Sequence, residues 1–272
     1  MRFRDRTIII TGASLGVGRA TAELFHREGA NVVMVARRLE PLEQAAAALG
    51  DGDRTLTIAA DVADNEALAH LVRATVERFG GIGGLVNNAG AHFRGPVATR
   101  EPDELSLMVD VNLRAPIALS SMVLPHLRAS GGFIVNVASL AGKVPLDGAA
   151  TYSATKFGLR AFSYAMAEEL RGTNVSVSVV SPGPIDTGFI MDELDEVEDI
   201  VLSQEICSAE DVAQMILACA SDQRVEREFP VSGAKLATLA YLVPGLRRWL
   251  KPRLVAKGAA QKARLRRDRG GG

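Results

Sequence analysis

Cysteine is nearly absent from this 272-residue chain, which contains only Cys207 and Cys219. Two thiols provide neither a disulfide framework nor a cysteine-rich metal cluster. The histidines are also few and show no ligand spacing, so we expect no metal site and interpret all four as surface or core residues: His26, His70, His92 and His126.

Long apolar runs are absent as well. No run reaches the ~18 residues expected of a membrane span, and the amino terminus, "MRFRDRTIII", lacks the apolar region of a signal peptide. These absences predict a soluble, cytoplasmic protein.

A net charge near zero conceals an asymmetry. The whole chain carries −1, whereas residues 231–272 hold eleven Lys or Arg and one Asp, a net +10. Residues 1–230 therefore carry 20 basic and 31 acidic residues, a net −11. The carboxyl-terminal part is thus chemically distinct from the rest.

Short apolar runs alternate with helical stretches along the first 232 residues. This alternation predicts βαβ units and a parallel sheet. The sequence therefore predicts one α/β domain over 1–232, a Rossmann-type doubly wound, seven-stranded and mostly parallel sheet, followed by an extension over 233–272. The predicted strands are 6–11, 30–36, 54–60, 82–88, 132–139, 174–181 and 226–232; the main helices are 40–49, 65–79, one within 102–129, and 151–171.

A glycine-rich turn, "TGASLGVG" at 11–18, separates the first strand from the first helix. Glycines permit a tight turn and close approach of a ligand, and the following helix start offers amide groups and a positive dipole end to a pyrophosphate. In this context the turn predicts a dinucleotide site, although its spacing differs from GxGxxG. The candidate binding residues are Gly12, Ser14, Leu15, Gly16, Val17 and Gly18.

Arg37 and Arg38 follow the second strand, where an NAD-binding domain usually places an acid for the ribose hydroxyl. An acid would repel a 2′-phosphate, whereas two guanidinium groups can bind it. The pair could also be solvated arginines that open a helix. With the glycine turn upstream, the sequence favours NADP over NAD.

Tyr152 and Lys156 lie four positions apart in "ATYSATKFGL", so on a helix they share one face. A cation beside a phenol favours the phenolate, and this predicts a tyrosine that can exchange a proton near neutral pH. Taken alone, the pair also fits an ordinary helix with an exposed Lys and a half-buried Tyr.

Several motifs occur in order between Thr11 and Thr187, and together they resemble the short-chain dehydrogenase/reductase family. The motifs are the TGxxxGxG turn at 11–18, Asp61–Val62, "NNAG" at 87–90, Asn112, Ser139, Tyr152 with Lys156, and "PGPIDT" at 182–187. The resemblance implies an oxidoreductase that transfers a hydride between a nicotinamide and a carbonyl or secondary alcohol.

The resemblance also implies roles for particular residues. Ser139 would bind the substrate oxygen and Tyr152 would exchange the proton. Lys156 would bind the nicotinamide ribose and stabilise the tyrosinate, and Asn112 would hold a relay water. The further cofactor contacts implied are Asp61 and Val62 at the adenine, Asn88, Ala89 and Gly90 at its ribose, and Pro182, Gly183, Ile185 and Thr187 toward the nicotinamide.

The segment after "PGPIDT", residues 188–208, contains seven acids and no Lys or Arg. We interpret this lid segment as a solvated helical cover over the substrate. Its acids argue against gripping an acyl carrier protein, and its apolar residues favour a hydrophobic or neutral substrate. The residues expected to face inwards are Phe189, Ile190, Met191, Leu194 and Val197.

Three function classes stay open: an NADP-dependent oxidoreductase, a ketoreductase for carrier-linked acyl chains, and a non-catalytic NADP-binding regulatory protein. The intact set of Asn112, Ser139, Tyr152 and Lys156 favours the first. The sequence further predicts a small-molecule carbonyl or alcohol substrate and no metal.

The extension continues with leucines interrupted by Pro244 and Pro252, then a basic half ending in three glycines, as in a disordered tail. Its apolar part could cover the pocket or a partner subunit, or it could contact a membrane periphery through Trp249, the leucines and the arginines. The acidic body argues against nucleic acid. We expect a homodimer built on helices 102–129 and 151–171 more than a tetramer.

Overall fold

The computed structural model describes residues 1–50 and 52–270. Seven strands form one sheet in the order β3-β2-β1-β4-β5-β6-β7, and every neighbouring pair is parallel. The sheet confirms the predicted doubly wound α/β fold. The strands are β1 Thr7–Thr11, β2 Asn31–Ala36, β3 Thr55–Ala59, β4 Gly84–Asn87, β5 Gly132–Val137, β6 Val175–Pro182 and β7 Glu226–Phe229.

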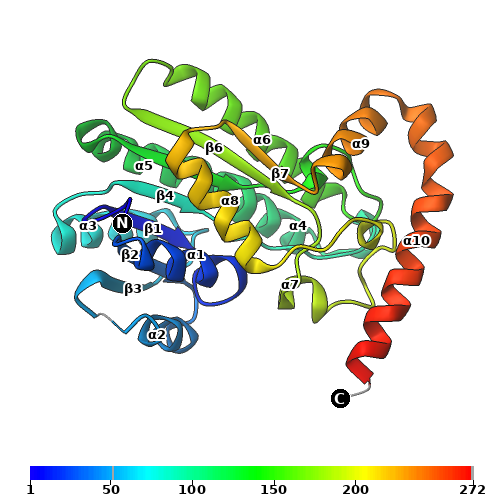
Figure 1. Ribbon diagram of the computed structural model, residues 1–272, viewed down its shortest axis with the longest axis horizontal. Coiled ribbons are helices and arrows are strands. Elements are labelled where there is room, and N and C mark those ends of the chain that lie inside the picture. The colour runs from blue at the N-terminus through cyan, green and yellow to red at the C-terminus, as the bar shows by residue number, and fades with distance from the viewer. Residues whose placement is uncertain (51, 271–272) are drawn as a thin grey trace.

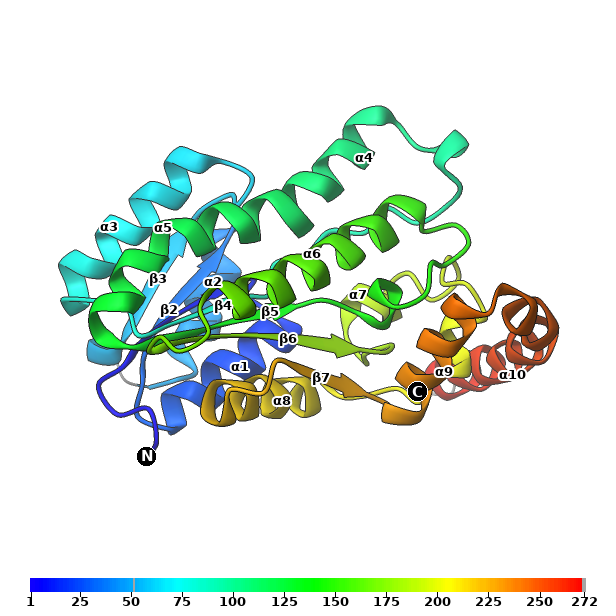
Figure 2. The same cartoon turned by 90° about the horizontal axis from the view of Figure 1, so that it is seen from above.

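Helices cover both faces of the sheet (Figures 1 and 2). On one face α3, α5 and α6 bury Leu71, Val123 and Met166 against the strands, and on the other α1 and α8 bury Phe25 and Ile216. Each strand is thus covered from two sides, which explains its continuous apolar run. The helices are α1 Gly16–Arg27, α2 Leu39–Ala47, α3 Asn65–Phe79, α4 Pro102–Val109, α5 Ala115–Ser130, α6 Ala150–Glu169, α7 Gly188–Met191, α8 Ala209–Asp222, α9 Val231–Leu242 and α10 Pro244–Gly270.

The predicted helix within 102–129 consists of α4 and α5 joined by a π-helical turn, Asp110–Arg114. By length and composition alone, Pro102–Ser130 could cross a membrane. Its inner residues, such as Leu119 and Leu127, are fully packed in the core beneath the sheet. A helix packed in this way belongs to the domain's own core.

The basic half of the extension differs from the sequence prediction. Pro244 opens α10 and Pro252 lies inside it, and the helix continues through the basic half to Gly270. The expected disordered tail is therefore wrong for the residues described, because α10 has a surface to pack on: the lid segment. Gly258 comes so close to Asp199 that an added Cβ would lie 1.6 Å from its carbonyl oxygen.

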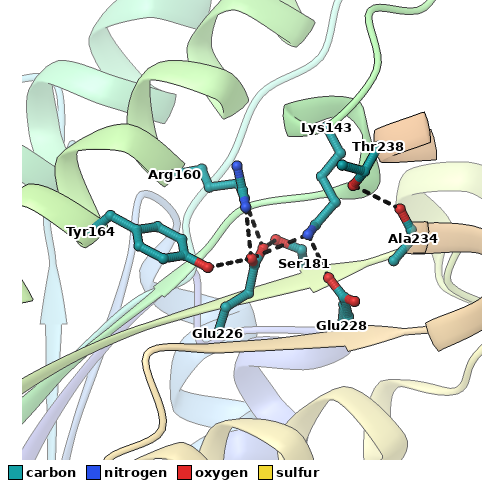
Figure 3. Close-up of polar contacts among 8 residues, drawn as sticks. All are labelled: Lys143, Arg160, Tyr164, Ser181, Glu226, Glu228, Ala234 and Thr238. Carbon is teal, nitrogen blue, oxygen red and sulfur yellow. Dashed lines mark hydrogen bonds and ion pairs between the residues drawn. The ribbon is translucent and has the colours of Figure 1, made fainter. Parts of the chain in front are cut away.

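A buried polar cluster fastens α6 to the edge of the sheet (Figure 3). The Glu226 side chain in β7 is 8% exposed. Its carboxylate accepts hydrogen bonds of 2.7–3.1 Å from Arg160 and Tyr164 of α6, from Ser181 of β6 and from Lys143. Because α6 also carries Tyr152 and Lys156, this cluster helps to fix both side chains relative to the sheet.

The same contacts decide the charge of Glu226. Burial raises its pKa, but the hydrogen bonds from Arg160, Tyr164 and Ser181 outweigh burial and lower the pKa to about 2. The group is therefore ionised throughout the neutral range.

We predict that Glu226→Gln costs about 3 kcal/mol of unfolding free energy at neutral pH, because it leaves the buried Lys143 and the half-buried Arg160 with less counter-charge. The folded pKa lies below the ordinary 4.5, so the carboxylate's contribution is present above pH ~4.5 and is lost as the pH falls toward ~2. Urea unfolding of the wild type and of Glu226→Gln, measured between pH ~4.5 and ~2, should show the difference in unfolding free energy decreasing as the pH falls. The exposed Glu169→Gln on the same helix is the control, and a gap independent of pH would contradict the assignment.

Candidate active site

A cavity of about 1060 Å³ lies at the carboxyl ends of the strands. Its wall runs from the glycine turn, through the residues after β4 and β5 and the start of α6, to the lid segment, α9 and α10. In an open parallel sheet this edge is where ligands bind. The residues that the sequence predicted as a site therefore line one cavity, with the exception of Gly18 and Asn112, which support it from behind.

The glycine turn is held by the ends of β1 and β4. The Thr11 hydroxyl accepts hydrogen bonds from the amides of Asn88 and Ala89, each at 3.0 Å, and the Asn88 side chain donates to the Thr11 carbonyl at 2.9 Å. Gly12 and Gly16 have φ values of +67° and +54°, which a side chain would strain. At Gly18 a Cβ would lie 2.1 Å from the Gly12 carbonyl oxygen.

Arg37 and Arg38 follow β2 directly, and both are exposed at the cavity wall. Across from them, Asp61 and Val62 follow β3, and the Asp61 carboxylate accepts a hydrogen bond from the Ala63 amide at 2.9 Å. The arginines thus stand at the rim where the second and third strands end.

The loop after β6 closes the cavity near the glycine turn. The Gly183 amide donates to the Phe229 carbonyl at 2.7 Å, and Ile185 forms a bridge with Cys207. The Thr187 side chain lies so near Gly16 that a Cβ there would be 3.3 Å from it. Pro182 ends β6 and also lines the cavity.

The lid segment is only partly as predicted. Its helical parts are α7 and a 3₁₀ turn, Val201–Ser203, and the rest is irregular. Four of the five apolar residues are buried: Ile190, Met191, Leu194 and Val197. Phe189 is 42% exposed and faces the cavity instead of the core.

Ser139, Tyr152 and Lys156 meet in the cavity wall. Ser139 follows β5 and accepts a hydrogen bond from the Ala141 amide at 3.1 Å, and its side chain lies beside that of Tyr152. Lys156 is 4% exposed, and its Nζ donates to the Val137 carbonyl at 2.9 Å while lying 5.6 Å from the Tyr152 ring centroid. One turn of α6 thus presents a phenol and an ammonium at the end of β5.

The expected lowering of the Tyr152 pKa is wrong for this state. Burial raises the pKa of Tyr152, and the opposing effects of the Ser139 hydrogen bond and the Arg94 charge are smaller. Burial also lowers the pKa of Lys156 to about 8. Burial therefore outweighs the effects that favour the phenolate, while the Lys156 ammonium donates to the Val137 carbonyl.

Asn112 lies in the π-helical turn and is fully buried. Its amide pairs with both backbone groups of Ala91, each at 2.8 Å, and contacts the Thr155 hydroxyl at 3.3 Å. It therefore fixes the loop after β4 against α6. The relay water implied by the resemblance stays a prediction.

Sequence reasoning missed His92 and Arg94. The imidazole of His92, interpreted as a plain surface or core residue, stacks on the Tyr152 ring at 4.0 Å between centroids. Burial, then the charges of Arg94 and Lys156, lowers its pKa to about 3. Its Nδ1 accepts from Arg94, so the proton of this neutral ring is on Nε2, which has no partner among the described residues.

Arg94 joins the loop after β4 to the lid segment. It is 8% exposed, and besides His92 it donates to the Glu193 carboxylate and the Phe189 carbonyl, both at 2.9 Å. The available signal was position: His92 and Arg94 follow the "NNAG" motif by two and four residues.

The residues fit a dinucleotide. Among the described residues no side chain caps the first turn of α1, and Leu15, Gly16 and Val17 at its start line the cavity. The positive-φ glycines leave the backbone bare there, and exposed arginines stand at the far rim. Anionic pyrophosphate suits this combination.

Comparison with known proteins gives the class. The family model described as short chain dehydrogenase matches residues 6–198. The chain belongs to the short-chain dehydrogenase family, and it is an NAD(P)-dependent oxidoreductase of that family.

Individual relatives agree. An uncharacterised oxidoreductase of Staphylococcus aureus is 33% identical over 186 residues, which are 68% of this chain and 80% of that protein. A metagenomic short-chain oxidoreductase in complex with NADP is 31% identical, with a TM-score of 0.71 over 85% of this chain and 98% of the other. A 3-ketoacyl-(acyl-carrier-protein) reductase from Brucella melitensis complexed with NADH is 28% identical, with a TM-score of 0.76 over 83% and 97%.

We predict that Gly18→Ala destabilises the fold by about 1–3 kcal/mol and weakens dinucleotide binding at least about tenfold, because the added methyl meets backbone in a packed turn. Thermal unfolding and cofactor titration measure the two effects. Gly81→Ala is the matched control, since no atom of the described residues lies within 4 Å of a Cβ there. Equal behaviour of the two variants would contradict the packing argument.

Proposed function

We propose that this protein is an NADP(H)-dependent oxidoreductase that interconverts a hydrophobic or neutral carbonyl compound and its secondary alcohol. The observation that carries the proposal is the meeting of Ser139, Tyr152 and Lys156 in the wall of one large cavity. We further propose that the protein is cytoplasmic and that it acts as a homodimer. The homodimer is supported by two exposed apolar residues on the helices expected to pair, Val109 and Ile117.

Each side chain has a specific task in this proposal. When bound, the nicotinamide supplies or accepts the hydride. The Tyr152 hydroxyl gives its proton to the carbonyl oxygen, or takes it from the alcohol, and the Ser139 hydroxyl donates a hydrogen bond to the same oxygen. The ammonium of Lys156 binds the ribose and stabilises the phenolate.

The far wall of the cavity supports the choice of substrate class. Helices α9 and α10 contribute Leu236, Ala240, Leu250 and Leu254 to it. Their apolar side chains favour a substrate with a hydrophobic body, because burying it removes apolar surface from water. A carrier-linked acyl chain is the second candidate, favoured by the likeness to the ketoacyl reductase.

Tyr152→Phe is expected to remove most turnover and leave cofactor affinity nearly unchanged, because only the proton-carrying hydroxyl is lost. A panel of carbonyl and alcohol substrates, followed at the NADPH absorbance band, measures turnover. Lys156→Ala should reduce both turnover and affinity, since its ammonium serves two groups. Near-normal turnover by Tyr152→Phe would refute the proposed chemistry, and turnover absent from the wild type across the panel would favour a regulatory protein.

The cofactor preference rests on the two arginines after β2. Their guanidinium groups are exposed and can form charge-assisted hydrogen bonds with a 2′-phosphate. We expect NADPH to bind more tightly than NADH, and Arg37→Ala to weaken NADPH binding by about ten- to a hundredfold. Titration of both cofactors tests this, with the exposed Arg73→Ala as control. Equal affinities of the wild type for the two cofactors would exclude the preference.

A further inference from the structure

The corner between α9 and α10 exposes a group of large apolar side chains. Leu242 is 70% exposed and Trp249 61%, well above the values typical of core residues in this chain. Isolated exposed apolar residues are common, but a contiguous group marks a contact surface. We call this group the apolar corner: Leu239, Tyr241, Leu242, Val243 and Trp249.

The two sides of α10 differ in chemistry. Its inner side packs on the body, with Lys262 and Arg266 paired to Asp199 and Asp195 of the lid segment. Outside this contact, α10 exposes Arg248, Arg253, Lys257 and Arg267 along its length. Among the described residues, neither Arg248 nor Lys257 has an ion-pair partner. The outer side is therefore a basic face next to the apolar corner.

We propose that the apolar corner and the outer face of α10 dock the protein on an anionic lipid surface. Leucine, tyrosine and tryptophan side chains are suited to the interface of a bilayer, and arginines and lysines beside them attract anionic headgroups. The Arg253 guanidinium lies over the Trp249 ring, 4.6 Å from its centroid, so the cation and the indole would lie at the same depth in a bilayer interface. The full helix lies at one end of the molecule, away from the sheet (Figures 1 and 2).

The charges on this surface also favour an anionic lipid surface as the occupant over a second copy of this chain. A second copy placed symmetrically on this surface would bring one basic face against another. The acids of the body that lie against α10, Asp147, Asp195 and Asp199, already pair with cations of the same helix. The phosphates of a nucleic acid could pair with the basic face, but a nucleic acid has no apolar surface that would bury the apolar corner, which includes the exposed Leu242.

Docking in this orientation would assist the proposed oxidoreductase reaction. This step of the inference rests on that proposed function. The inner sides of α9 and α10 line the cavity through Leu236, Ala240 and Leu250, while their outer sides form the docking surface. The same two helices thus separate a lipid surface from an apolar cavity. The substrate class that fits is a hydrophobic carbonyl compound that partitions into membranes.

The chain's single tryptophan, Trp249, lies within the proposed surface and reports on it directly. The full-length protein is mixed with vesicles of phosphatidylglycerol and phosphatidylcholine, or of phosphatidylcholine alone, and tryptophan emission and flotation are measured. We expect a blue shift and co-flotation with the anionic vesicles only, both weakened by added salt because salt screens the attraction.

Two variants and one control separate the parts of the surface. Leu242→Glu and the double variant Arg248→Glu/Lys257→Glu should each bind the anionic vesicles at least about tenfold more weakly. The control Arg4→Glu/Arg73→Glu has the same charge change at the opposite end of the molecule and should bind as the wild type. Thermal unfolding and NADPH titration verify that all variants fold; none of the substituted residues lines the cavity.

The proposal is overturned if the wild type neither floats nor shifts its emission at low salt, or if the control loses as much binding as the double variant. It is also overturned if a DNA duplex binds as tightly as the anionic vesicles with the same variant dependence, or if Leu242→Glu only reduces the oligomeric state. These readouts need no turnover, so failure of the proposed oxidoreductase chemistry would leave the vesicle result interpretable.

Discussion

The buried ammonium of Lys156 is the constraint on which the site depends. A charge that is 4% exposed needs a fixed acceptor, and the Val137 carbonyl at the end of β5 provides it. Helix α6 must therefore lie close to the turn that follows β5. At Gly142 a Cβ would come within 2.6 Å of the Lys156 carbonyl oxygen, so the two segments pack backbone to backbone.

Further polar contacts hold the later turns of α6 close to the sheet. Asn136 of β5 donates to the Ser163 hydroxyl at 2.9 Å in the core, and Asn87 of β4 donates to Asn136 at 2.8 Å. With the Glu226 cluster at the sheet edge, these contacts hold α6 along its length. The phenol and the ammonium are thus positioned by a helix that is anchored to β5 through Ser163 and to β7 through Arg160 and Tyr164.

Local patterns in the sequence were sufficient to predict the fold and most of the cavity wall. Helix α3 has the predicted bounds because an amphipathic repeat lies between Asp64, whose side chain caps the first turn, and Gly80, which ends it with φ +78°. Contacts between distant segments could not be predicted in this way. The stacking of His92 on Tyr152, the raised pKa of that tyrosine and the order of α10 all depend on which side chains the fold brings together.

The π-helical turn between α4 and α5 has an evolutionary implication. Such a turn contains one residue more than an α-helical turn, and its hydrogen bonds are poorer. A deletion of one residue there would restore a regular helix, yet each residue of an α-helix turns by about 100°, so Asn112 would rotate away from Ala91. A deletion that restores regular helical geometry would thus be disfavoured, because the loop after β4 would lose its contact with Asn112. Insertions and deletions should therefore be rarer at this turn than in the surrounding turns.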